Sequence, residues 1–306
     1  MSTFSVSDPL VAPGPWTQRR VSANGSQFHI SEAGQGPLVL LLHGFPEFWW
    51  AWRHQLPRIA QTGFRAVAMD LRGYGGSDKT PRGYDPATSA ADVTGVVKAL
   101  GEQRAVLVGH DWGAWVAWSA AALRPAHVTA LASMSMPHPL QTRALLRRGG
   151  WTRSGVSLRS QLPFAPERAL AANGGALVAS LLQASTPPGS TFPDDEAISR
   201  YSAALAQWPS SHCALEYQRW AFRSSFRIDG RRYARRMAAA ISVPVLQLHG
   251  RLDPQVPLRA VTPARDHVVG PHELIELEGV GHYPHEEAPD QVSDILLRWL
   301  NQHTPR

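Results

Sequence analysis

A five-residue segment, Gly109-His110-Asp111-Trp112-Gly113, has the spacing of the G-x-S-x-G nucleophile elbow but carries aspartate where an esterase carries serine. A serine hydroxyl must lose a proton before it attacks, whereas a carboxylate at neutral pH is already an anion. A carboxylate can therefore displace a leaving group at a saturated carbon, and the product is an alkyl ester of the enzyme. This segment predicts that Asp111 is a nucleophile of that kind.

The flanking residues predict the strand, turn and helix in which such an elbow sits. Residues 105–108 form a short apolar run typical of a buried parallel strand. Residues 114–123 are apolar on nearly every face and too long for another strand, so we expect a buried helix. The two glycines of the segment leave room for a sharp turn. The structural alternative is that Asp111 only caps this helix, because aspartate is a favoured N-cap residue.

An acid and a histidine follow the elbow in the order that this kind of site requires. Asp253 comes just after an apolar run, residues 243–248, that predicts a buried strand. His282 stands in a glycine-rich turn after residues 274–277, the last predicted strand. Because the carboxyl ends of parallel strands meet at one edge of a sheet, we expect these side chains to converge with Asp111.

An upstream turn supplies the expected oxyanion hole. The predicted strand at residues 37–42 leads into His43-Gly44-Phe45-Pro46, and the glycine and proline favour a fixed turn. The backbone amide of Phe45 is expected to point into the site beside the amide of Trp112. His43 is expected to pack within the turn.

These motifs resemble those of the epoxide hydrolases with the α/β-hydrolase fold, over about residues 27–300. The stretches that carry the resemblance are His43 to Arg53, Asp70 to Asp78, Gly109 to Ala114, and the segments around Asp253 and His282. The resemblance implies a nucleophile at Asp111, a charge-relay partner at Asp253 and a water-activating base at His282. It also implies a mostly parallel central sheet flanked by helices, with a helical cap inserted into this core.

The cap must supply a hydrogen-bond donor to the departing epoxide oxygen, and a phenol does so without bringing a charge into an apolar pocket. Epoxide hydrolases of this family usually place two cap tyrosines over the nucleophile. Residues 214–220 resemble the segment that bears the second of these, which favours Tyr217. The place of the other falls near Val156, which is not a tyrosine, so Tyr201 or Trp151 is the expected substitute.

A haloalkane dehalogenase is the nearest alternative, because it would share Asp111 and could hold a halide with the indole of Trp112. Such enzymes commonly carry Asn or Glu at the position of Phe45, and dehalogenases that act on fluoroacetate follow the nucleophile with arginine. This chain has neither feature. We therefore expect an apolar pocket lined by Phe45, Pro46 and Trp112, which takes a small apolar epoxide and water. No metal or organic cofactor is expected, since the histidines show no metal-ligand spacing.

Two alternative functions do not involve catalysis. A receptor for a small apolar ligand would gain nothing from an intact set of Asp111, Asp253 and His282. Nucleic-acid binding is suggested only by the formal net charge of +6 and by arginines clustered in residues 143–153 and 231–236. No stacking motif or DNA-reading module accompanies them. The clusters are interpreted as solvated cap faces, or as a weak attraction to anionic surfaces or partners.

Length and composition are those of one enzyme-sized unit. With 306 residues and 43% apolar content, the chain can bury a large core. We expect an α/β-hydrolase core in two parts, residues 1–137 and 241–306, separated by a helical cap at residues 138–240. The single cysteine, Cys213, cannot form an internal disulfide, and neither a signal peptide nor a membrane span is predicted. A cytoplasmic monomer or homodimer is expected.

Overall fold

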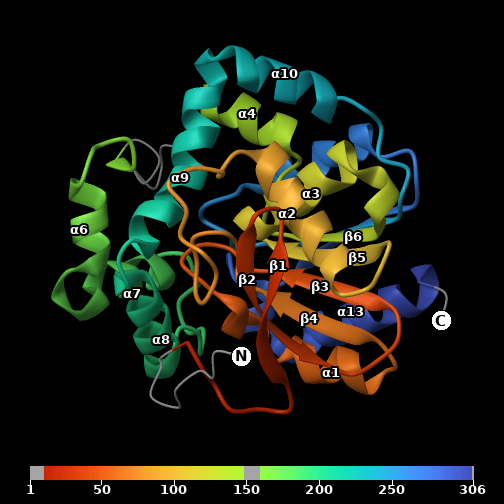
Figure 1. The fold of residues 1–306 in the computed structure, drawn as a ribbon, viewed down its shortest axis with the longest axis horizontal. Coiled ribbons are helices and arrows are strands. Elements are labelled where there is room, and N and C mark those ends of the chain that lie inside the picture. The colour runs from red at the N-terminus through yellow and green to blue at the C-terminus, as the bar shows by residue number, and fades with distance from the viewer. Residues whose placement is uncertain (1–9, 148–158, 305–306) are drawn as a thin grey trace.

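The computed structural model describes residues 10–147 and 159–304 of the chain. At its centre is an eight-stranded sheet with the order β1-β2-β4-β3-β5-β6-β7-β8 (Figure 1). β2 is antiparallel to both of its neighbours, and the strands from β4 to β8 in this order pair in parallel. The expected mostly parallel sheet is therefore confirmed.

The sequence predicts strands near residues 27–32, 38–42, 65–69, 105–109, 128–134, 243–248 and 274–277, and each of these is present; one further strand is not predicted. The strands are β1 (Thr17–Ala23), β2 (Ser26–Ala33), β3 (Leu38–Leu42), β4 (Arg65–Met69), β5 (Ala105–His110), β6 (Val128–Met134), β7 (Val245–Gly250) and β8 (His272–Leu277). The additional strand is β1, which pairs only with β2 at the edge of the sheet and is largely exposed. Because an edge strand needs few apolar residues, its polar sequence gave no strand signal.

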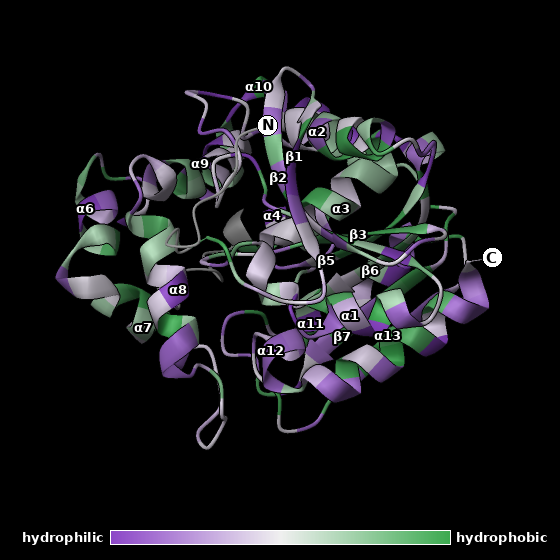
Figure 2. Cartoon of the chain, turned by 60° about the horizontal axis from the view of Figure 1, so that its bottom comes forward, coloured by the Kyte–Doolittle hydropathy of each residue, from purple (hydrophilic) through white to green (hydrophobic). Residues whose placement is uncertain are grey.

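Helices cover both faces of the sheet. α1 (Gln55–Gln61) and α13 (Pro289–His303) pack together on one face, and α2 (Pro86–Ala99) and α3 (Trp112–Leu123) pack together on the other (Figure 1). The dipeptide Asp85-Pro86 predicts a helix start, and α2 begins there, because Asp85 accepts hydrogen bonds from the amides of Ala87 and Thr88. Hydrophobic and hydrophilic residues alternate along α13, as expected of a helix with one face on the sheet (Figure 2).

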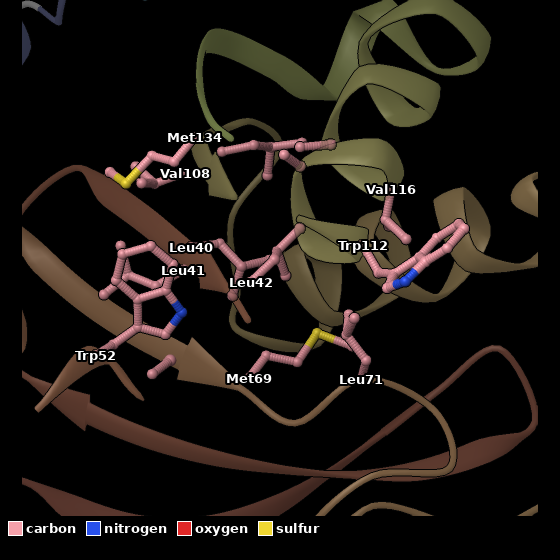
Figure 3. Close-up of a cluster of buried hydrophobic side chains, with 14 of the residues drawn as sticks. Leu40, Leu41, Leu42, Trp52, Met69, Leu71, Val108, Trp112, Val116 and Met134 are labelled. Atoms are coloured by element: carbon pink, nitrogen blue, oxygen red, sulfur yellow. The ribbon is translucent and has the colours of Figure 1, made fainter. Parts of the chain in front are cut away.

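The core lies where the central strands meet α3 and the segment that follows β3. Leu40, Leu41, Leu42 and Met69 are fully buried. Figure 3 shows their side chains gathered with those of the neighbouring elements, including Trp52, Leu71, Val108, Trp112, Val116 and Met134. This packing fixes the carboxyl ends of β3 and β5, from which the predicted oxyanion turn and elbow emerge.

The chain between β6 and β7 is mostly helical where it is described, with loops between the helices. Its helices are α4 (Pro139–Arg147), α6 (Ala165–Ala171), α7 (Ala176–Gln183), α8 (Asp195–Ala206), α9 (Ser210–Arg223) and α10 (Ile228–Met237). They lie beside the sheet and above one end of it (Figure 1). We call this segment the cap. Within the described ranges, no helix combines the length and the apolar character that crossing a bilayer requires.

Two short helices lie near the end of the chain. These are α11 (Leu258–Val261) and α12 (Pro284–Glu287). α12 follows directly after His282, so its side chains lie close to the predicted site.

Candidate active site

Asp111 occupies a strained turn between β5 and α3. Its backbone has φ +46° and ψ −119°, a conformation that L-residues rarely adopt and that is typical of functional sites. The turn is tight, because a Cβ atom on Gly113 would lie 2.1 Å from the carbonyl oxygen of Leu42. The Asp111 side chain makes no capping hydrogen bond to α3. The alternative in which this residue serves only as an N-cap is therefore wrong.

His282 and Asp253 form a hydrogen-bonded pair beside the elbow. Nδ1 of His282 lies 2.9 Å from Oδ2 of Asp253, and Nε2 lies 3.9 Å from Oδ1 of Asp111. The other oxygen of Asp253 accepts hydrogen bonds from the amides of Gln255 and Val256, at 2.8 and 2.9 Å. The loop after β7 therefore fixes the carboxylate, and the carboxylate orients the imidazole.

The turn that carries His282 is held from two sides. The carboxylate of Glu287 accepts hydrogen bonds from the amides of Gly281 and Tyr283, at 2.7 and 2.8 Å. The amide of His282 itself donates to the carbonyl oxygen of Ser185, at 3.0 Å. Ser185 follows α7, so one of these contacts comes from the cap.

The buried charges perturb the pKa values of this trio. Burial alone would lower the pKa of His282, but the charge and hydrogen bond of Asp253, with the charge of Asp111, raise it to about 9. Burial tends to raise the pKa of Asp253, yet His282 holds it below its ordinary value. The pKa of Asp111 is raised, mainly by burial, although His282 opposes this shift.

The amides predicted to form the oxyanion hole face the Asp111 carboxylate. The amide of Phe45 donates to Oδ2 of Asp111 at 3.0 Å, and the amide of Trp112 also acts to lower the pKa of this carboxyl. His43 packs within the turn as expected, where Nδ1 donates to the Gly44 carbonyl and Nε2 accepts from the amide of Leu71. The structure therefore brings together Asp111, Asp253, His282 and both amides.

A second buried cluster, which the sequence analysis did not identify, supports this site. The carboxylate of Glu47 accepts a hydrogen bond from the amide of Gly44 and contacts Nδ1 of His110, both at 2.9 Å. Nε2 of His110 lies 2.8 Å from the carbonyl oxygen of His282. His110 therefore connects the oxyanion turn, the elbow and the turn that carries His282.

His285 completes the cluster, with Nε2 3.1 Å from Oε1 of Glu47. Burial would raise the pKa of Glu47, but the two imidazoles hold it well below its ordinary value. One carboxylate oxygen and one nitrogen from each imidazole lie within 4.8 Å of one another, as metal ligands could. Because these atoms already contact one another and the Gly44 amide, we interpret the cluster as support for the oxyanion turn.

The hydroxyl groups of the predicted cap tyrosines are directed to other acceptors. Tyr217 is buried in α9, and its hydroxyl donates to the carbonyl oxygen of Arg72 at 3.0 Å. Its ring lies against Tyr74, with centroids 5.8 Å apart. The hydroxyl of Tyr74 has no hydrogen-bond partner among the described residues, and the charge of Asp111 helps to raise its pKa, although burial is the main cause. Tyr74 is thus a phenol near the site that sequence reasoning missed.

The second predicted donor is placed differently from expectation. Tyr201, on α8, is fully buried against Phe48 and Trp50, and its hydroxyl donates to the carboxylate of Glu286. Glu286 also pairs with Arg53 at 2.7 Å. Tyr201 therefore joins the cap to the core and does not offer its hydroxyl to the site. Trp151, the other candidate, lies outside the described residues.

A hollow of about 380 Å³ lies between Phe45 and the cap helices. Its walls are mostly leucines and alanines of α6, α7 and α9, including Leu170, Leu177, Leu181 and Leu215. Among the predicted pocket residues, Phe45 lines this hollow, whereas Pro46 and Trp112 are buried and do not line it. An apolar hollow next to the oxyanion turn fits an apolar substrate.

Comparison with known proteins first places the chain in a class. A family model described as alpha/beta hydrolase fold matches residues 37–289. The chain therefore belongs to the α/β-hydrolase fold family, as the sheet order and the strained elbow indicate.

Comparison with individual relatives identifies the family within this class. The chain is 31% identical to epoxide hydrolase A of Mycobacterium tuberculosis, over 94% of this chain and 98% of the relative. It is 32% identical to an epoxide hydrolase of Caballeronia sordidicola, over 92% of each chain. The crystal structure of an epoxide hydrolase from Vigna radiata matches with a TM-score of 0.81 and 27% identity, over 94% of this chain and 98% of that one. The chain belongs to the epoxide hydrolase family, whose members are hydrolases acting on ether bonds.

Proposed function

We propose that this chain hydrolyses an apolar epoxide to a vicinal diol through a covalent ester on Asp111. The observation that carries the proposal is the placement of the Asp111 carboxylate. One of its oxygens accepts from the Phe45 amide at 3.0 Å, and the other lies 3.9 Å from Nε2 of His282. The carboxylate is thus positioned both to attack a substrate and to be attacked, once esterified, by water that His282 activates.

In the first half of the reaction, an oxygen of Asp111 attacks the less hindered epoxide carbon, and the carbon–oxygen bond of the ring breaks. The departing oxygen needs a hydrogen-bond donor, because an alkoxide is a poor leaving group. We assign this role to Tyr217, whose hydroxyl must turn from the Arg72 carbonyl toward the substrate to fill it.

In the second half, His282 takes a proton from water, and the hydroxide attacks the ester carbonyl of Asp111. The amides of Phe45 and Trp112 stabilise the oxyanion that forms. When this intermediate collapses, the bond between the acyl carbon and the ester oxygen breaks, His282 returns its proton to the departing oxygen, and the diol leaves. Esterification itself prepares this step. It removes the negative charge of Asp111, which contributes to the raised pKa of His282, so the pKa falls and the imidazole becomes a better base. These steps require no metal or organic cofactor.

An oxygen-labelling experiment tests the covalent step. In a single turnover in H₂¹⁸O with enzyme in excess, we expect unlabelled diol and one heavy oxygen on Asp111. The reason is that water attacks the acyl carbon and the ester oxygen leaves with the product. Mass spectrometry after digestion in ordinary water locates the label, and the peptide that contains Asp253 is the internal control. Labelled diol with an unlabelled protein would exclude the ester.

Replacing Tyr217 by phenylalanine tests the donor. We expect ester formation to slow by roughly 100-fold, within the range of general acid catalysis, because the departing oxygen loses its proton source. Single-turnover kinetics with an epoxide measure this step. Tyr233→Phe is the matched control, since this cap tyrosine is bonded to Ser119 at 2.7 Å, and it should react at the wild-type rate.

An unchanged rate in Tyr217→Phe would remove this residue from the mechanism. A slow step in Tyr74→Phe, combined with that result, would instead place the donor on the loop after β4.

A further inference from the structure

One surface of the cap combines exposed apolar side chains with exposed arginines. We define the basic-apolar surface as Phe226, Ile228, Arg231 and Arg235. Phe226 is 78% exposed and Ile228 is 61% exposed, values that are high for large apolar side chains. Both arginines are also exposed, and no ion pair among the described residues engages them. Such a surface is not explained by the reaction at Asp111.

Three of these side chains share one face of α10, and Phe226 lies in the turn just before this helix. Ile228, Arg231 and Arg235 are three and four residues apart, which is one side of a helix, and they line a shallow groove with Arg143. The opposite side of α10 packs on α3 and α4, with Gly230 and Met237 buried. α10 lies at the periphery of the molecule (Figure 1). Its outer face is therefore available to a partner.

The turn before α10 holds the apolar part of this surface in place. The guanidinium of Arg143 donates to the carbonyl oxygens of Ser224, Ser225 and Gly230, each at 3.2 Å. These three bonds link α4 to the turn from which Phe226 and Ile228 project. The outward placement of two apolar side chains is thus built into the fold.

We propose that the basic-apolar surface docks the enzyme on an anionic lipid bilayer. Arginines attract acidic headgroups, and adjacent apolar side chains enter the headgroup boundary, as in helices that lie in the plane of a membrane interface. Arg232 and Arg236, also exposed on α10, add positive charge beside this face. The phosphates of a nucleic acid would also pair with the arginines, but they offer no apolar contact to Ile228. The observations therefore favour a lipid bilayer. Docking of this kind would bring the enzyme to the phase in which apolar compounds concentrate.

Vesicle sedimentation measures membrane binding and requires no catalysis. Its result is therefore independent of the proposed function. At low ionic strength we expect the protein to sediment with vesicles of phosphatidylserine and phosphatidylcholine, and not with phosphatidylcholine alone. The double variant Arg231→Gln with Arg235→Gln should bind roughly 30-fold more weakly. Phe226→Asn with Ile228→Asn should also weaken binding, because the apolar contact is lost.

The control is Lys98→Gln with Arg298→Gln. It removes the same charge from two exposed positions outside α10, on α2 and α13, and should bind vesicles as the wild type does. Equal sedimentation with neutral and anionic vesicles would overturn the proposal, as would a control that binds as weakly as the arginine variant. The variant Phe226→Asn with Ile228→Asn could bind vesicles as the wild type does, while the unmodified protein binds RNA as tightly as it binds anionic vesicles. That result would overturn the proposal, because it would indicate a nonspecific attraction of the arginines to polyanions.

All these variants should turn over a dissolved epoxide at the wild-type rate, because none of the changed residues touches the site.

Discussion

A His282→Ala variant given an excess of a small aryl epoxide is expected to accumulate the covalent ester, with one whole substrate molecule bound to each enzyme molecule. Asp111 can still attack, since it keeps its carboxylate oxygens and the hydrogen bond from the Phe45 amide, but no base remains beside it to activate water. Turnover should fall by roughly 10⁴-fold or more, as for other catalytic bases. Intact mass spectrometry measures the adduct, and peptide mapping should place it on Asp111.

The same variant distinguishes the alternative functions. An adduct of the whole epoxide mass is expected, whereas an alkyl bromide should give little or none. A stable alkyl adduct that lacks bromine, with no epoxide adduct, would favour a dehalogenase. No adduct with either reagent, together with no diol from the unmodified enzyme, would favour a receptor without catalysis.

Replacing Asp111 by asparagine should abolish turnover, also by roughly 10⁴-fold or more, because the neutral amide is a poor nucleophile. The change should leave the fold intact, since it keeps the size of a side chain in a tight turn. It should also lower the pKa of His282 below about 9, because the charge of Asp111 contributes to that value. Diol formation measures the first effect, and NMR titration of labelled histidine measures the second.

Asp253→Asn is the informative comparison for the pKa, because it removes the partner that contributes most to raising it. We expect a larger fall than in Asp111→Asn. Residual diol formation in Asp111→Asn at more than a hundredth of the wild-type rate would argue that water attacks the substrate directly.

Much of the fold was accessible from the sequence because the relevant signals are local. Buried parallel strands such as β3 and β5 are continuous apolar runs, and α2 begins at an aspartate followed by proline. β1 was missed because an edge strand keeps its polar residues in solvent. The residues at the ends of β5, β7 and β8 were likewise predictable, since parallel topology alone brings those ends together.

The rest of the site depends on contacts between distant segments. Glu47, His110 and His285 lie far apart in the chain, and only the packing of the oxyanion turn, the end of β5 and α12 makes them neighbours. The tyrosines show the same limit. A phenol in the cap is visible in the sequence, but whether its hydroxyl meets Arg72, Glu286 or substrate depends on helix packing. The order of the motifs along the chain predicts that Asp111 and His282 converge. It does not predict which group the Tyr201 hydroxyl contacts.

The contact between the His282 amide and the Ser185 carbonyl has a consequence for protein engineering. The side chain of Gln255, two residues after Asp253, donates a hydrogen bond to the Ser185 hydroxyl at 2.8 Å. Ser185, a cap residue, therefore contacts both the turn that carries His282 and the loop that carries Asp253. Replacing Ser185 would remove the hydroxyl that Gln255 contacts, whereas the backbone carbonyl that holds the His282 amide would remain. Changes in residues 185–191 that move the Ser185 backbone are therefore expected to disturb the hydrolytic step, and point substitutions that leave this backbone in place are expected to spare the His282 contact.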